Sequence, residues 1–166
     1  RGFKYSDVFI TPNESELKSW GVKQIGAGVF QPHEMGLTGR ASSQALMGRV
    51  TETLGQYKEA WPEMYQEEYR ASGGSGALLE AHVTMGKPAE IGDGYHFYSA
   101  IKGADAYTRQ LVHNVVNCVT GENIFSMTGF GCLFNLNTRK LVKNDEAGIA
   151  ELNRHAIPAF SRQDAD

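Results

Sequence analysis

Three residues of this sequence combine side chains suited to acid–base chemistry with a position at a helix: His33, Glu34 and Glu52. His33 and Glu34 directly precede the one long stretch with helical periodicity, and Glu52 lies inside it. An imidazole or a carboxylate can activate a water molecule or attack a carbonyl carbon. The alternative is that His33 and Glu34 are exposed turn residues, with Glu34 placed for the helix dipole, and that Glu52 is a solvated helix glutamate.

The start of the same helix offers backbone N–H groups for a developing oxyanion. The first N–H groups of a helix have no partner within it, and the helix dipole favours negative charge there. We expect the segment Gly36–Arg40 to lie at this end, which makes the N–H groups of Gly36, Leu37 and Gly39 the candidate oxyanion donors.

The helix that would position these groups is predicted over 42–60. Its apolar residues recur at spacings of four and three and share one face: Leu46, Val50, Leu54, Tyr57 and Trp61. Thr38 or Ser42 can cap its start, and Pro62 ends it. Glu52 shares the opposite face with small residues, namely Ala41, Ala45, Gly48 and Gly55. Glycine costs a helix up to about 1 kcal/mol relative to alanine. This face therefore predicts either a close approach by a partner subunit or ligand, or a solvated surface.

Most of the remaining chain has the pattern of strands. They are expected at 22–31, 77–85, 95–102, 109–119 and 123–136, with a short strand at 7–10. Short turn-like links predict that the last four strands form antiparallel hairpins, with bulges or bends at Gly129 and Gly131. Helical segments are predicted at 14–20, 63–70 and 146–155, and a flexible link at 72–76.

This order predicts an α+β fold in which one antiparallel sheet wraps around one long central helix. One helix cannot also cover the other face and the edges of the sheet, so we expect a homodimer or a dimer of dimers. With 166 residues, the chain predicts a single domain over 1–166, with its core over about 22–142 and a polar tail over 144–166.

The composition excludes several classes of function. A formal net charge of −3 argues against nucleic-acid binding. No apolar run approaches the roughly 18 residues of a membrane span, and no signal-peptide pattern is present, although residue 1 is Arg. Cys118 and Cys132 lie in apolar strand-like runs and are predicted to be free thiols, which favours the cytoplasm.

The sequence lacks the patterns that would predict a metal site or a serine hydrolase. His82, His96 and His113 lie on separate predicted strands without the spacing of metal ligands, so no metal site is predicted. We interpret His113 as a polar residue on one face of its strand. Ser42 and Ser43 lack a G-x-S-x-G context, which argues against a serine hydrolase.

The region from Val22 to Val142 resembles the hotdog-fold thioesterases, typified by 4-hydroxybenzoyl-CoA thioesterase and related acyl-CoA thioesterases. The resemblance lies in the turn Pro32–Gly36 before the helix, the strand 77–85, the long hairpin 109–136 and the run Lys87-Pro88-Ala89-Glu90-Ile91-Gly92-Asp93. In the family, the corresponding run reads basic residue, Pro, then Leu or Ile, Gly, Asp. The family's Asp-x-x-Gly-His motif before the helix differs here, where His33 replaces the Asp and Leu37 follows Gly36.

The resemblance implies hydrolysis of acyl-CoA or acyl-carrier thioesters, with coenzyme A as part of the substrate and no resident cofactor. Glu52, Glu34 and His33 are then the candidates for the catalytic group, since some family branches place the acidic residue on the helix. The candidates for binding coenzyme A phosphates are Arg40, Arg49 and Lys87, for which surface ion pairing is the alternative role.

Two other functions fit the same resemblance. One is a non-catalytic hotdog module that binds acyl thioesters or serves as an assembly subunit, which the replacement of Asp by His33 suggests. The other is a dehydratase of 3-hydroxyacyl thioesters, whose usual helix-edge motif is not visible in this sequence.

Overall fold

The computed structural model describes residues 11–54 and 56–160. Within them, the strands are β1 Lys23–Val29, β2 Gly74–Met85, β3 Gly94–Ala104, β4 Arg109–Asn117, β5 Asn123–Asn135 and β6 Lys140–Val142. The α-helices are α1 Glu14–Ser19, α2 Ser43–Leu54, α3 Glu67–Ala71 and α4 Glu146–Arg154. Short 3₁₀ turns cover Pro32–Glu34, Pro62–Tyr65 and Pro158–Phe160. The predicted strand at 7–10 lies outside the described residues.

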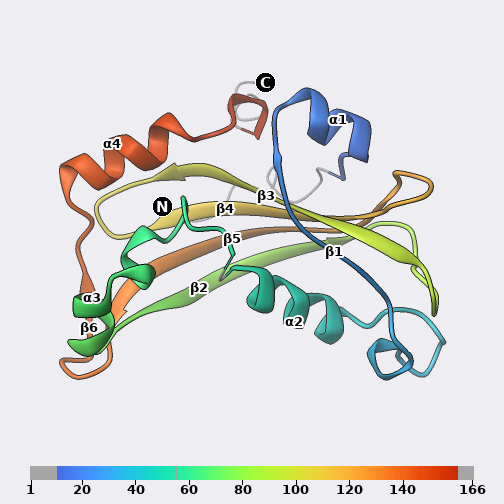
Figure 1. The fold of residues 1–166 in the computed structure, drawn as a ribbon, viewed down its shortest axis with the longest axis horizontal. Coiled ribbons are helices and arrows are strands. Elements are labelled where there is room, and N and C mark those ends of the chain that lie inside the picture. Colours follow the sequence, from blue (N-terminus) through green and yellow to red (C-terminus); the bar gives the residue numbers. More distant parts are fainter. Residues whose placement is uncertain (1–10, 55, 161–166) are drawn as a thin grey trace.

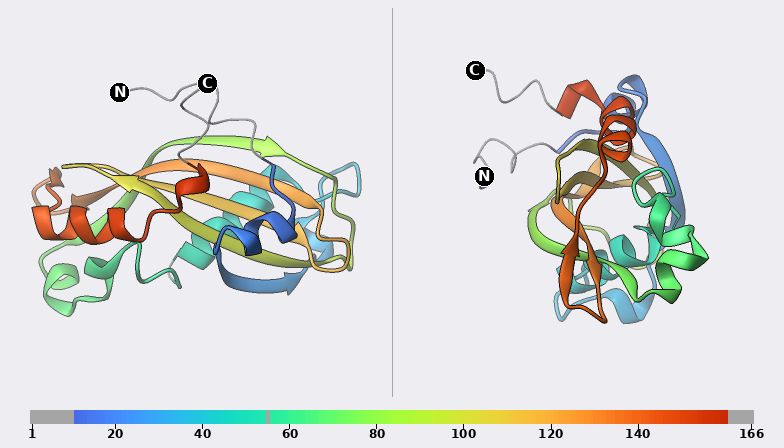
Figure 2. Two further views of the ribbon diagram at one scale, coloured as in Figure 1. Left: turned by 90° about the horizontal axis from the view of Figure 1, so that it is seen from above. Right: turned by 90° about the vertical axis from the view of Figure 1, so that its left-hand side faces the viewer.

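The strands form one antiparallel sheet in the order β1-β3-β4-β5-β2, and β6 pairs with the end of β5. The sheet curls, as the end-on view in Figure 2 shows. The hairpins β3–β4 and β4–β5 confirm the prediction. A hairpin between β2 and β3 was also expected, and this was wrong, because β2 pairs with β5 while β3 pairs with β1. The link 86–93 therefore carries the chain across the sheet.

The two faces of the sheet have separate hydrophobic cores. Alternate residues of β3, β4 and β5 pack on one face against α2 and Trp61, with Phe97, Leu111 and Phe125 among them. The opposite face packs Tyr98, Val112 and Val116 against residues of α1 and the C-terminal segment. Figure 1 shows α2 and α3 on one side of the strands and α1 on the other.

The central helix is shorter than predicted. α2 ends at Leu54, whereas the prediction extended it to Ala60. The predicted apolar face is nevertheless buried where it is described: Leu46 and Val50 within α2, and Tyr57 and Trp61 beyond it. Turn hydrogen bonds, such as the one from the Ala60 N–H to the Tyr57 carbonyl, bring the last two into the same core. The apolar spacing therefore predicted the burial of Tyr57 and Trp61 correctly, although the backbone at these two residues is not α-helical.

Two other segments are more ordered than predicted. The expected flexible link 72–76 is wrong from Gly74 onward, because residues 74–76 of β2 pair with residues 133–135 of β5. The tail beyond residue 144 is not merely polar, since Leu152 and Phe160 are buried in the two cores. Among the described residues, no helix combines the length and apolar character needed to cross a membrane.

Candidate functional site

Three of the predicted charged residues form one cluster. The Arg49 Nε donates to Glu34 Oε1 at 2.7 Å, and its Nη1 donates to Glu52 Oε2 at 3.0 Å. Arg49 and Glu52 come from successive turns of α2, and Glu34 comes from the 3₁₀ turn Pro32–Glu34. The fold therefore brings together two predicted catalytic residues, and the guanidinium holds both.

The two carboxylates of this cluster differ in their freedom to react. Glu34 is 5% exposed, and its second oxygen accepts a hydrogen bond from the Gln31 N–H at 2.7 Å. The Arg49 hydrogen bond keeps the pKa of Glu34 below its ordinary value, so Glu34 is ionised and both of its oxygens are engaged. The Glu52 side chain is 66% exposed, and its Oε1 has no partner among the described residues. Of the two, only Glu52 has a free oxygen that could activate water.

The predicted oxyanion donors are placed differently from the expectation. α2 begins at Ser43, so Gly36, Leu37 and Gly39 lie in a turn before it. The Gly36 N–H donates to the Arg40 carbonyl at 2.8 Å and the Gly39 N–H to the Gly36 carbonyl at 3.0 Å. Placing these residues at the helix end was wrong, because this turn satisfies two of the three N–H groups. The N–H of Leu37 has no partner within the described residues.

The true start of α2 does carry unpaired donors. Ser42 caps the helix, accepting from the Ala45 N–H at 3.1 Å through its Oγ. The N–H groups of Ser43 and Gln44 make no hydrogen bond within the described part of the chain. From Ser43 to Glu52 the helix rises about 13 Å at about 1.5 Å per residue. In a single chain, these donors and the free Glu52 oxygen cannot reach one carbonyl group.

The predicted basic residues divide into two groups. Arg40 is exposed, and its side chain has no partner among the described residues. Its segment is hydrogen-bonded to the link 86–93, since the Ala41 N–H donates to the Ala89 carbonyl at 3.0 Å, and Lys87 on that link pairs with Glu122. Arg40 and Lys87 therefore belong to adjoining segments near the start of α2, whereas Arg49 is occupied by two carboxylates. His33 is exposed on the turn before the helix.

A cavity of about 560 Å³ lies between α2 and the inner face of the sheet. We call it the chamber. Its walls include Val50, Trp61, Leu111 and Met127, which are buried, while exposed residues such as Leu78 mark its opening. Its remaining lining residues are Met47, Thr51, Met64, Tyr65, Arg70, Gly76, Ala77, His113, Gly129 and Gly131. Neither Glu34 nor Glu52 is among them, although Thr51 precedes Glu52 directly.

Gly129 and Gly131, the predicted bulge or bend sites, also shape this chamber. The register between β2 and β5 shifts between the pairs Leu78–Gly131 and Glu80–Phe130, so the predicted irregularity does lie at Gly131, and β5 shifts again opposite β4 near Val116. A Cβ on Gly131 would lie 2.6 Å from the Trp61 ring, and one on Gly129 would lie 3.0 Å from Leu78. The two glycines therefore make room for side chains that form the chamber wall.

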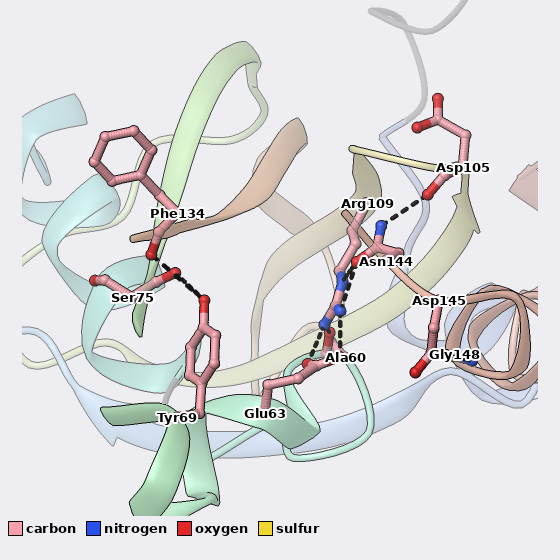
Figure 3. A network of polar contacts seen from close by, with 10 residues as sticks. All are labelled: Ala60, Glu63, Tyr69, Ser75, Asp105, Arg109, Phe134, Asn144, Asp145 and Gly148. Carbon is pink, nitrogen blue, oxygen red and sulfur yellow. Dashed lines mark hydrogen bonds and ion pairs between the residues drawn. The ribbon is translucent and has the colours of Figure 1, made fainter. Parts of the chain in front are cut away.

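A buried arginine fixes the outer part of this wall. Arg109 is 0% exposed, and its guanidinium donates to both carboxylate oxygens of Glu63, at 2.6 and 2.7 Å. It also donates to the Ala60 carbonyl at 2.8 Å and to Asn144 Oδ1 at 2.8 and 3.2 Å. Figure 3 shows these contacts converging from three separate segments. Because Arg109 also lies 5.1 Å from the Trp61 ring centre, the network holds the segment 60–63 against the sheet.

Sequence reasoning missed two residues of the site. Tyr95 on β3 is near enough to the charged cluster for Glu34 and Glu52 to help raise its pKa, after the larger effect of burial. Its hydroxyl has no hydrogen-bond partner among the described residues. His113 lines the chamber and was interpreted only as a polar residue of its strand. For both, the available signal was inward parity, since each alternates with core residues such as Phe97 and Leu111.

No protein-family model matches the sequence, and neither does any curated protein. Solved structures do resemble it. The probable thioesterase YbaW from Escherichia coli has a TM-score of 0.65 at 9% identity, covering 81% of this chain and 99% of that one. A hypothetical protein from Staphylococcus aureus, in complex with CoA, has a TM-score of 0.69 at 12% identity and coverages of 81% and 87%. The 12:0-ACP thioesterase from Umbellularia californica has a TM-score of 0.67 at 18% identity.

This chain has the hotdog fold. The resemblance found in the sequence is thereby confirmed for the fold, with a curled antiparallel sheet and a shorter helix than expected. The chain covers 54% of the Umbellularia thioesterase, with 82% of its own residues matched. Identities between 9% and 18% leave the chemistry of this hotdog domain to be argued from its own residues.

Proposed function

We propose that this hotdog domain hydrolyses acyl thioesters and binds the acyl group in the chamber. The observation that carries the proposal is the apolar cavity of about 560 Å³ beside α2, which lies in the size range of small-molecule sites. The similar structures named as thioesterases and the one in complex with CoA support the same class of substrate.

Glu52 is the proposed general base. Its Oε1 is free, and Arg49 fixes the carboxylate from the other oxygen. Glu34 is proposed to position Arg49, because both of its own oxygens are engaged. The N–H groups of Ser43 and Gln44 are the proposed oxyanion donors, in place of Gly36 and Gly39. Such donors stabilise the charge of a tetrahedral intermediate.

Because Glu52 lies about 13 Å along the helix from its start, the proposed roles of Glu52 and of the N–H donors lead us to propose that two copies of the chain build each site. β2 is a twelve-residue edge strand that pairs only with β5 among the described strands. Its exposed apolar residues are Leu78, Leu79, Val83 and Met85. An unpaired edge of this kind invites pairing with a second copy. In an antiparallel pair of β2 strands, the Gly76 end of one strand would lie next to the Met85 end of the other. The Gly76 end lies beside the chamber of its own chain. The Met85 end leads to Lys87 and to the segment that contacts the start of α2. We therefore propose a homodimer with shared sites, and a dimer of dimers remains compatible with it.

Arg40 and Lys87 are proposed to bind the phosphates of coenzyme A or of a carrier's phosphopantetheine. Arg40 is the more available, since Lys87 pairs with Glu122. Replacing Arg40 by Gln should raise KM for a CoA thioester while leaving turnover of a short N-acetylcysteamine thioester unchanged, because only the first carries phosphates beyond the pantetheine arm. The cytoplasm stays our proposed location, and both cysteines being free thiols supports it.

The decisive experiment follows thiol release from a panel of acyl-CoA thioesters of increasing chain length. Glu52→Gln should lower kcat/KM by about 10²- to 10⁴-fold, the usual contribution of a general base. Glu151→Gln is the matched control, since Glu151 is another exposed helix carboxylate paired with an arginine. Full activity in Glu52→Gln would refute the assignment of the base. A protein that stays monomeric at assay concentration and is still active would refute the shared site.

A non-catalytic module that binds acyl thioesters is the second candidate. The engagement of both Glu34 oxygens and the exposure of His33 favour it, because the segment before the helix then offers no reactive carboxylate. Binding of CoA thioesters without release of thiol from any of them would support this function over hydrolysis.

A further inference from the structure

Two buried side chains with N–H groups line the chamber, those of His113 and Trp61, and the indole N–H of Trp61 has no hydrogen-bond partner among the described residues. The imidazole is 1% exposed and lies on the inner face of β4, between the core residues Leu111 and Val115. Its Nδ1 lies 2.6 Å from the Oγ of Ser99, which is 0% exposed on the neighbouring strand β3. The Phe97 ring packs against it with ring centres 6.0 Å apart. The other ring nitrogen, Nε2, has no hydrogen-bond partner within the described part of the chain.

The contacts of Ser99 indicate which nitrogen carries the proton. The Ser99 hydroxyl has one hydrogen, and the only partner of its Oγ among the described residues is His113 Nδ1. If Nδ1 carried the proton, the hydroxyl hydrogen would have no acceptor in a buried site, which is unfavourable. The arrangement that satisfies both groups has the hydroxyl donating to Nδ1. The proton then sits on Nε2, and Nε2–H is a donor at the chamber wall.

The imidazole is suited to donating a hydrogen bond and not to accepting a proton. Burial lowers the pKa of His113 to about 3, so the ring is neutral across the physiological range. No carboxylate lines the chamber, so an acceptor for Nε2–H must come from a bound molecule. Space for one exists beside the ring, because His113 itself lines the cavity of about 560 Å³.

We propose that the chamber selects acyl groups that carry an oxygen substituent along the chain, a hydroxyl or an oxo group, which accepts a hydrogen bond from His113 Nε2–H. The inference rests on the proposed function in that the chamber receives the acyl group of the thioester. In a largely apolar wall, an unpaired N–H distinguishes such a group from an unsubstituted chain, because only the oxygenated group can accept its hydrogen bond. His113 is in this view a specificity-determining residue, and Ser99 fixes its tautomer.

The test compares decanoyl-CoA with its hydroxy and oxo derivatives substituted at successive positions. At least one derivative should have a kcat/KM about ten- to a hundredfold higher than decanoyl-CoA, which corresponds to one buried hydrogen bond gained. His113→Phe keeps an aromatic ring but removes the donor, and should abolish this preference. Met127→Leu, which alters the same wall without touching the donor, is the control and should keep the preference. Equal rates for all substrates in the native protein, or a preference that survives in His113→Phe, would overturn the inference and leave the proposed hydrolysis intact.

Binding measurements can distinguish a failure of this inference from a failure of the proposed hydrolysis. Calorimetry with free decanoic acid and its hydroxy and oxo derivatives should show the same preference even if no thioester is hydrolysed. In the native protein, ¹⁵N NMR should show His113 protonated at Nε2, and the Nε2 signal should shift when the preferred acid binds. Ser99→Ala should weaken the preference, because nothing then holds the imidazole proton on Nε2. This variant provides the test if His113→Phe does not fold. Protonation at Nδ1, or no binding of any of these acids, would overturn the proposal.

Discussion

The Arg109 network provides the sharpest test of the energetics of this fold. Its guanidinium is fully buried, and Glu63 is the only carboxylate bonded to it among the described residues. Replacing Glu63 by Gln keeps the size of the side chain but removes the negative charge. Arg109 is then left as a buried cation held only by neutral oxygens, those of Ala60, Asn144 and the new amide.

The expected loss follows from the burial of the two partners. Removing one member of a buried ion pair costs about 3–5 kcal/mol. The Glu63 side chain is 24% exposed, so water reaches it and we expect the lower end, about 3 kcal/mol. For a domain of this size, about 2–4 °C of Tm accompanies each kcal/mol, which gives a decrease of about 6–12 °C. The matched control is Glu59→Gln, whose partner Lys23 is 53% exposed, and there we expect about 0–1 kcal/mol.

Urea denaturation and thermal melts of the native protein, Glu63→Gln, Arg109→Met and the double variant would measure these differences. The double variant should be less destabilised than the sum of the single variants by about 2 kcal/mol or more, because the second change removes the charge that the first one leaves unpaired. A Glu63→Gln variant within 1 kcal/mol of Glu59→Gln would refute the reasoning. Additive single and double variants would refute it as well.

Three further predictions concern other parts of the molecule. The pKa of His113 lies at about 3 in the fold and at about 6.5 in the unfolded chain, so below pH 6.5 the unfolded state binds a proton that the native state does not. Stability should therefore fall by up to about 1.4 kcal/mol per pH unit between pH 6.5 and 3, and this contribution should be absent in His113→Phe. Gly48→Ala should stabilise the chain by about 0.5–1 kcal/mol in chemical denaturation, since a Cβ there meets nothing within 4 Å; destabilisation would instead show that a second copy packs on this face. Ser42→Ala should cost about 1 kcal/mol in the same assay by removing the cap on the Ala45 N–H, whereas Ser43→Ala, one residue inside the helix, should cost a few tenths or less.

The sequence alone predicted the elements whose signals are local. Alternation along β3, the β-branched composition of β4 and the length of β5 predicted these strands, and the short turn-like links between them predicted their hairpins, because all of these signals are local in the sequence. The spacing of Leu46, Val50 and Trp61 identified the buried face around α2. The hotdog resemblance was based on the turn before the helix, the strand 77–85, the run 87–93 and the long hairpin 109–136.

The tertiary structure decided what depends on contacts between distant segments. The chain crosses from β2 to β3 through a link that looks locally like a hairpin turn, so only the pairing of β2 with β5 reveals the order of the strands. Gly129 and Gly131 were predicted as bulge or bend sites, and only the fold shows that they also make room for Leu78 and Trp61 in the chamber wall.

The candidate site divides in the same way. Its residue types were visible in the sequence, and Glu34, Arg49 and Glu52 were all named from it. Their different proposed roles could not be predicted from the sequence, because the hydrogen bonds of each Glu34 oxygen depend on where the turn at 32–34 meets α2. His113 was set aside because a lone histidine on a strand has no distinguishing pattern. Its significance comes from Ser99 on the neighbouring strand and from the cavity beside it, which form only when the sheet curls around the helix.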